Sequence, residues 1–213
     1  MRKLGFLVLV VVMLLAIDEL AKAFSSRTIA SAVERKVQGV SSVDADIDSF
    51  PYLGRLLVQG SVSELDVTFR NVTGHGIDVA QLRFEAEGLE LDRGVLFSRR
   101  NVRVRDVDRV TAEATITEEQ IRKVTGADIR LADGRATVSA GGATATATIK
   151  VVEGRVRMEV GSLPAVSIPI PDAELLPCAV EAEVVEDALV LSCSTDQLPA
   201  IVVDAIGHVD LQG

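Results

Sequence analysis

Four side chains in this sequence are of types that perform general-base, thiol or metal chemistry near neutral pH: His75, His208, Cys178 and Cys193. His75 lies in the turn-forming segment 73–76 with no Ser or Cys nucleophile in a recognised setting nearby, and His208 follows the last predicted helix. Two cysteines alone do not build a zinc site with the usual four ligands. The sequence therefore predicts no catalytic centre, no metal site and no cofactor, and we do not expect an enzyme.

The two cysteines are better explained as a structural pair. They flank two short apolar runs, 179–185 and 188–191, which are separated by Glu186 and Asp187. A hairpin turn near residues 185–186 would place Cys178 and Cys193 at equal distances from the turn, which suits a cross-strand disulfide. Two separate buried thiols are the alternative. A redox-active pair would normally have two residues between its cysteines.

Composition excludes other classes of function. The chain has 213 residues, 22 Lys and Arg against 31 Asp and Glu, a net charge of −9, one Tyr and no Trp. Such a chain has no general attraction to nucleic acids and few aromatic rings on which bases or sugars stack. Its length fits one domain with a proper core.

The N-terminus has the parts of an export signal. Arg2 and Lys3 precede an apolar run over residues 4–17, and Ala21 and Ala23 form a small-residue cleavage site. The run would span roughly 21 Å as a helix, which is short of the ~30 Å bilayer core. We therefore expect residues 1–23 to be a signal peptide, and residues 24–213 to form one exported domain. The alternative is an uncleaved membrane anchor, in which Ile17, Leu20 and Phe24 continue as one helix into the following segment. Asp18 and Glu19 favour this alternative, because acidic residues are unusual near a cleavage site.

The mature chain begins with a helical pattern and continues with strands. A helix from Ser26 to Gly39 is predicted by the spacing of Ile29, Val33, Val37 and Val40. Period-two alternation follows from Val43, with phase slips between Val79 and Leu82 and again at Gly88, which we interpret as β-bulges that bend a sheet. A third stretch over 102–116 places four apolar residues on one face: Val110, Ala112, Ala114 and Ile116.

Shorter elements fill the second half. Thr117 and Gln120 form a capping box for a helix that Gly126 ends. Asp133-Gly134 and Glu153-Gly154 are hairpin turns within an antiparallel meander, and the Pro-rich segment 164–177 is expected at a sheet edge. Thr195 is expected to cap a last helix over 196–206. The sequence thus predicts an α+β fold with a long curved antiparallel sheet and short capped helices.

Two local clusters are candidates for binding. The loop containing Phe50, Tyr52, Leu53, Leu56 and Leu57 can line a ligand mouth or dip into a bilayer surface, or it can simply fill the core. A cluster of Arg99, Arg100, Arg103 and Arg105 can hold a lipid phosphate or face an anionic membrane surface, although solvated strand charges are the simpler explanation. Asp44, Asp46 and Asp48 share a strand face and lack the Gly and Glu of a calcium loop.

Several segments taken together resemble one family. They are Phe50-Pro51-Tyr52-Leu53 with Leu56, Leu57 and Gly60; the strand 65–72; residues 107–110 leading into Thr117-Glu118-Glu119; and Leu176-Pro177-Cys178 with Cys193 and Leu198-Pro199. This order and spacing resembles the LmeA-like phospholipid-binding family of bacterial cell-envelope proteins. Ser49 and Tyr52 stand where Gly and Phe are more usual.

The resemblance implies an exported actinobacterial protein whose curved sheet wraps around an N-terminal helix, as in the tubular lipid-binding (TULIP) folds. It also implies binding of phospholipid, especially of phosphatidylinositol types, and a role in maturing mannosylated envelope lipids. An adaptor that positions an envelope mannosyltransferase without binding lipid is the alternative. The residues expected to line an acyl-chain groove lie on the helix, the loop and the strands: Ile29, Val33, Val37, Phe50, Tyr52, Leu53, Leu56, Leu57, Phe69, Leu82, Phe84 and Ile116. The four arginines are expected to contact the headgroup.

Overall fold

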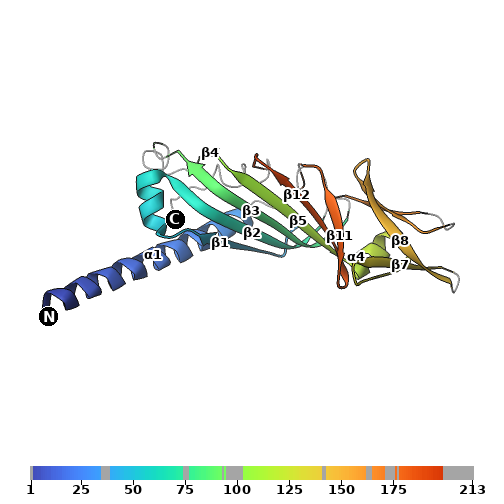
Figure 1. The fold of residues 1–213 in the computed structure, drawn as a ribbon, viewed down its shortest axis with the longest axis horizontal. Coiled ribbons are helices and arrows are strands. Elements are labelled where there is room, and N and C mark those ends of the chain that lie inside the picture. Colours follow the sequence, from blue (N-terminus) through green and yellow to red (C-terminus); the bar gives the residue numbers. More distant parts are fainter. Residues whose placement is uncertain are drawn as a thin grey trace.

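A computed structural model describes residues 2–34, 39–73, 77–92, 94, 103–140, 143–161, 165–170, 176 and 178–198, with side chains from Val12 onward except those of Ala32 and Ala140. It is elongated, with the N-terminal helix at one end and a small sheet at the other (Figure 1). The helical elements are α1 (Arg2–Glu34), α2 (Tyr52–Gly54), the π-helical turn η1 (Arg55–Gln59) and α4 (Glu118–Thr125). The α+β prediction is confirmed.

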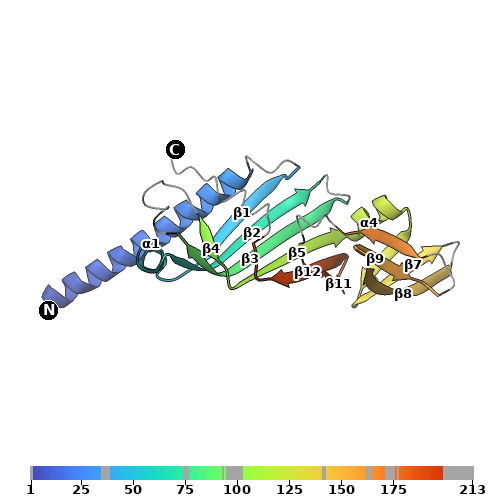
Figure 2. The same cartoon turned by 90° about the horizontal axis from the view of Figure 1, so that it is seen from above.

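The strands form two antiparallel sheets, and the larger is the long curved sheet expected from the sequence. The larger is a curled sheet in the order β1-β2-β3-β5-β12-β11, with β4 also paired to β3 (Figure 2). Its strands are β1 (Ser42–Asp48), β2 (Ser61–Val72), β3 (Val79–Leu91), β4 (Val104–Asp106), β5 (Arg109–Thr117), β11 (Glu181–Val185) and β12 (Ala188–Thr195). The smaller is a meander in the order β10-β9-β8-β7-β6, with strands β6 (Asp128–Ala132), β7 (Arg135–Ala140), β8 (Ala143–Val152), β9 (Arg155–Glu159) and β10 (Val166–Pro169). The predicted hairpins and the edge position of the described Pro-rich strand are confirmed.

The phase slips in β3 are real, but their cause differs from the one predicted. Burial skips one position between Val79 and Leu82 and again at Gly88. The β2–β3 register stays constant through both positions, because β2 skips at matching places, around Ser63 and Asn71. Neither slip is therefore a bulge that adds a residue to one strand. Gly88 adopts a φ of +64°, and a Cβ there would lie 2.0 Å from Asp108 Oδ2, so both conformation and space require glycine.

The stretch 102–116 is two strands rather than one. β4 and β5 are separated at Val107 and Asp108, and the β3–β4 register shifts between Glu90 and Leu91. The four apolar positions of β5 are all buried, as its alternation predicts.

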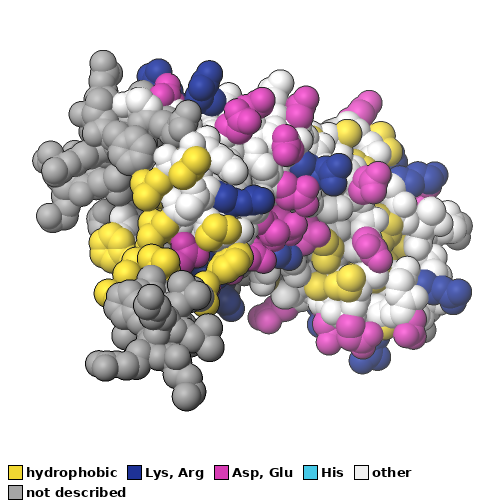
Figure 3. Space-filling model, turned by 60° about the vertical axis from the view of Figure 1, so that its left-hand side comes forward, with side chains coloured by type: hydrophobic (Ala, Val, Ile, Leu, Met, Phe, Trp, Pro, Cys, Tyr) yellow, Lys and Arg dark blue, Asp and Glu magenta, His cyan; other side chains and the backbone are white. Residues whose placement is uncertain are grey.

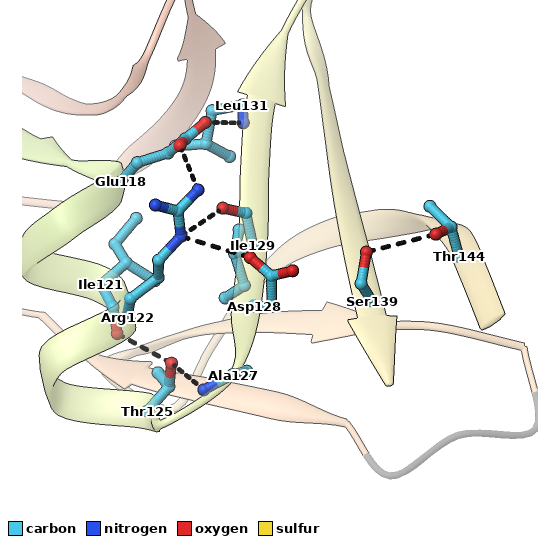
Figure 4. A network of polar contacts seen from close by, with 10 residues as sticks. All are labelled: Glu118, Ile121, Arg122, Thr125, Ala127, Asp128, Ile129, Leu131, Ser139 and Thr144. Atoms are coloured by element: carbon cyan, nitrogen blue, oxygen red, sulfur yellow. Dashed lines mark hydrogen bonds and ion pairs between the residues drawn. The ribbon is translucent and has the colours of Figure 1, made fainter. Parts of the chain in front are cut away.

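Helix α4 joins the two sheets. Thr117 and Gln120 form the predicted capping box, and Gly126 ends the helix at a φ of +68°. Glu118 Oε2 accepts the Leu131 N–H of β6 at 2.6 Å, and Arg122 Nε donates to the Ile129 carbonyl at 2.9 Å (Figure 4). Because Asp187, in the β11–β12 turn, also exchanges backbone hydrogen bonds with Glu118 and Leu131, the larger sheet, α4 and β6 form one junction.

The N-terminal helix differs from the predicted one. α1 is continuous from Arg2 to Glu34, so Ser26 lies inside the helix and does not cap its start. It packs mainly along β1 and against α2, and its N-terminal half projects beyond the rest of the molecule (Figures 1 and 2). The predicted last helix lies, from residue 199 onward, outside the described residues, as do His75 and His208.

The predicted disulfide is present, but its register was wrong. Cys178 and Cys193 are bonded, with a Cα–Cα distance of 5.6 Å. The turn is at Glu186 and Asp187, so β11 pairs Glu181 with Ser192 and Cys178 lies before the strand begins. The bridge therefore ties the segment preceding β11 to the middle of β12, and it does not link two directly paired positions.

Candidate lipid-binding site

The inner face of the larger sheet carries rows of apolar side chains that run across the strands. In one row Val43, Phe69, Leu82, Ala114 and Leu191 are successive cross-strand partners. The next row contains Ala45, Val67, Phe84, Ala112 and Cys193. Almost all of these side chains are buried, and small alanines of β5 stand beside large residues of β3. This face is apolar across five strands.

The strand residues predicted for the site meet on this face. Phe69 and Phe84 lie on adjacent rows with their ring centroids 5.9 Å apart and their planes at 89°, an edge-to-face contact. Leu82 is the direct cross-strand partner of Phe69, and Ile116 is paired with Leu189 in β12. The structure thus brings together four residues that are scattered over 48 positions of sequence.

The predicted helix residues lie beside the sheet edge. Val33 is buried in the core, and Ile29 is partly buried against it. Val37 lies outside the described residues. The last described turns of the helix therefore pack next to β1, at the edge of the larger sheet.

The loop 50–59, which we call the mouth loop, is helical and lies between β1 and β2. The Phe50–Pro51 peptide bond is cis, and α2 and η1 follow it. Tyr52 is buried, and Leu53 and Leu56 pack against the core, whereas Phe50 is 64% and Leu57 50% exposed. Half of the loop therefore fills the core, as one of the two alternatives predicted, and the other half presents apolar side chains to the outside.

Asp18 is a contact that the sequence analysis missed. Its side chain is buried, and its two carboxylate oxygens accept the N–H groups of Tyr52 at 2.9 Å and Leu53 at 2.7 Å. The Tyr52 hydroxyl also donates to Ser25 Oγ at 2.9 Å. Burial, which outweighs the hydrogen bond to Ser25, raises the pKa of Tyr52, and the nearby Asp18 charge adds to this. An acidic residue on the same helix face as Ile29 and Val33 was the available signal.

An exposed apolar surface is present where α1 projects. Its large exposed side chains are Val12, Met13, Leu14, Leu15, Ile17, Leu20 and Phe24. Leu20 and Phe24 are 71% and 72% exposed, although α2 contacts the same helix. Figure 3, which turns this end toward the viewer, shows hydrophobic side chains gathered there beside residues that are not described. Within the described part of the chain, no helix has the length and apolar character needed to cross a membrane.

The described headgroup candidates lie at the same end of the sheet as the mouth loop. Arg103 and Arg105 are exposed, while Val104 between them packs against the core. Leu91, the partner of Val104, donates its N–H to the carbonyl of Gly60, the residue that ends η1, at 2.7 Å. These two arginines therefore lie near the mouth and point away from the inner face. Arg99 and Arg100 lie outside the described residues.

The outer face of the sheet is polar and mostly acidic. Asp44, Asp46 and Asp48 are exposed along β1, as predicted, and Asp66 pairs with Arg83. Burial, followed by repulsion from Glu85 and other nearby carboxylates, raises the pKa of Glu64. Among the described residues, no group of three His, Cys, Asp or Glu side chains is placed to hold a metal ion. The outer face is thus polar, whereas the inner face is apolar.

A separate pocket of about 350 Å³ lies where the smaller sheet meets β11. It is lined by residues of β7, β8 and β11 and by the turn before β7. The lining residues include Arg135, Ala147, Ile149, Glu183 and Val184. None of the predicted site residues lines it.

Comparison with known families adds an independent result. The model of the family described as LmeA-like phospholipid-binding matches residues 16–202, which confirms the resemblance noted from the mouth loop, the capping box and the cysteines. No curated protein and no solved structure matches the chain. The matched segment contains the curled sheet, the mouth loop and the whole of the smaller sheet. With most of its length matched, the chain belongs to the LmeA-like phospholipid-binding family.

Proposed function

We propose that this protein is exported to the cell envelope, where it binds phospholipid without catalysing a reaction. The acyl chains would lie along the inner face of the curled sheet. The observation that carries the proposal is the continuous apolar face across five strands, in a chain whose family is described as phospholipid-binding. Each acyl methylene buried on such a face contributes about 0.8 kcal/mol, so binding needs no catalytic group. The disulfide supports an oxidising compartment outside the cytoplasm.

The finer parts of the proposal concern the headgroup and the pathway. We place a phosphatidylinositol-type headgroup at the mouth, where the exposed Arg103 and Arg105 can pair with its phosphate. The bound lipid would support the maturation of mannosylated envelope lipids by another enzyme. The described arginines point away from the inner face, which suits a phosphate held at the rim.

The test is lipid extraction and mass spectrometry of protein purified without detergent from its own envelope. A stoichiometric phospholipid is expected, and its mass identifies the headgroup. A folded, lipid-free protein that also fails to take up added phosphatidylinositol would overturn the proposal. The adaptor that positions a mannosyltransferase would then become the leading explanation.

We also propose that the mouth loop lies on the membrane surface. Phe50 and Leu57 are exposed beside the apolar surface of α1, which favours contact with lipid over contact with water. The chain contains no Trp, so single tryptophans report on chosen positions. With phosphatidylcholine vesicles containing phosphatidylinositol, Phe50→Trp is expected to show blue-shifted emission that lipids with brominated acyl chains quench.

The matched control is Val152→Trp, because Val152 is also exposed but lies in β8 of the smaller sheet, at the opposite end of the molecule. Its emission is expected to stay unchanged when vesicles are added. Equal responses at both positions, or none at Phe50→Trp, would contradict docking through the mouth loop.

A further inference from the structure

The N-terminal helix contains a residue that ties the expected signal segment to the folded domain. Cleavage after Ala23 would remove Asp18, although both of its carboxylate oxygens bind backbone N–H groups of the mouth loop. Asp18 is only 7% exposed, so these bonds are shielded from water. Loss of the carboxylate would leave the N–H groups of Tyr52 and Leu53 without this acceptor, and hydrogen bonds to charged groups are among the stronger ones in proteins.

The helix face that binds the domain continues across the expected cleavage site. Asp18, Ser25, Ile29 and Val33 recur at spacings of seven, four and four residues, which places them on one face of α1. Ala21 also packs against the core. The domain therefore uses residues on both sides of Ala23 as one packed surface.

The family match gives a second, independent indication. The matched segment begins at residue 16, seven residues before the end of the expected signal. The sequence of a signal peptide that is removed is not constrained by the mature fold, whereas the sequence of a segment that stays in the fold is constrained by it.

From these observations we propose that residues 1–23 are retained in the mature protein and that Asp18 is a positioning residue for the mouth loop. The exposed apolar segment 12–17 inserts into the bilayer and ends at Asp18. The carboxylate then holds α2 and η1 where the helix leaves the membrane. The helix and the mouth thus form one unit, and the protein is tethered beside the membrane from which it takes lipid.

Retention is tested by the intact mass of the full-length protein recovered from the envelope of an exporting bacterial host. The expected mass includes residues 1–23. A mature N-terminus at Phe24 would overturn the proposal.

The positioning role is tested by hydrogen exchange of Asp18→Ala. Peptides covering residues 52–59 are expected to exchange at least about tenfold faster, while those from β3 and β5 stay unchanged. Glu19→Ala is the matched control, because Glu19 is the adjacent acid, is exposed and pairs only with Lys22 among the described residues. Asp18→Asn keeps one acceptor oxygen and is expected to give an intermediate rate, which keeps the test usable if Asp18→Ala does not fold. Unchanged exchange in both variants would overturn the role.

A kinetic measurement separates positioning from general stability, and this part rests on the proposed function. Asp18→Ala is expected to take up phosphatidylinositol from phosphatidylcholine vesicles about tenfold more slowly, with the same amount bound at saturation. An unchanged uptake rate would contradict the positioning role. If no variant binds phospholipid, the proposed function fails, while the exchange data still decide whether Asp18 holds the loop.

Discussion

Replacing Phe84 with Asp is expected to abolish phospholipid retention. Phe84 is almost fully buried in the middle of an apolar row, between Val67 and Ala112, and its ring contacts Phe69 edge to face. A carboxylate at this position either remains charged in an apolar environment or draws water onto the inner face, and both outcomes disfavour the binding of acyl chains there. We expect at least about a tenfold loss of phospholipid that co-purifies with the folded protein.

The control for this substitution lies on the same strand. Gln81 is half-buried on the outer face of β3, so Gln81→Asp adds the same charge away from the proposed site. Its lipid content is expected to match that of the unmodified protein. Phospholipid retained by a folded Phe84→Asp protein would remove the inner face from the proposed site.

A gentler substitution keeps the question answerable if Phe84→Asp destabilises the fold too far. Val67→Thr is nearly isosteric and adds one hydroxyl to the same row as Phe84. An unpaired hydroxyl on an apolar face costs about 1–3 kcal/mol, so lipid affinity is expected to fall by about tenfold while the fold persists. Unchanged affinity would point to a different surface for the acyl chains.

Removing the disulfide is expected to cause a large loss of stability. The Cys178–Cys193 bond closes a loop with a sequence separation of 15, for which loop-closure entropy gives about 3 kcal/mol. Cys193 is also buried in the row that contains Phe84. The Cys178→Ala/Cys193→Ala double variant should therefore unfold at lower denaturant and hold lipid less well, because β12 forms part of the proposed site.

Denaturant unfolding with and without reductant checks this prediction. Reductant should lower the unfolding midpoint of the unmodified protein and leave that of the double variant unchanged. Ser194→Ala, at an exposed position next to Cys193, should change the unfolding free energy by less than about 0.5 kcal/mol. A double variant as stable as the unmodified protein would show that the bridge constrains the chain little.

The location of the proposed site follows from strand pairing more than from any single motif. Phe69 and Phe84 lie in the consecutive strands β2 and β3, whereas Ile116 lies in β5 and Leu189 in β12. Only the constant registers of β2–β3, β3–β5 and β5–β12 bring them onto one surface. The alternation within each strand correctly predicted which side chains face inward, because side-chain direction in a strand depends only on local backbone geometry.

Local signals also predicted the elements of the smaller sheet. The capping box at Thr117, the turns at Asp133-Gly134 and Glu153-Gly154, and the edge position of the Pro-rich strand all have short-range causes. These signals act within a few residues, so they can be recognised without knowledge of the rest of the chain.

What only the tertiary structure decided depends on contacts between distant residues. The division into two sheets is fixed at α4, where Glu118 binds Leu131 and Asp187. The pairing of the disulfide-bonded hairpin differs from the expected one, because Cys178 lies before β11 and not within the strand that the sequence predicted. Most consequential is Asp18, which is 34 residues from Tyr52 and looks from sequence like an unusual charge after a signal. Composition and periodicity predicted a sheet protein with one apolar face. The position of the mouth loop was decided only when folding brought the helix and the loop together, since a carboxylate binds whichever N–H groups folding brings to it.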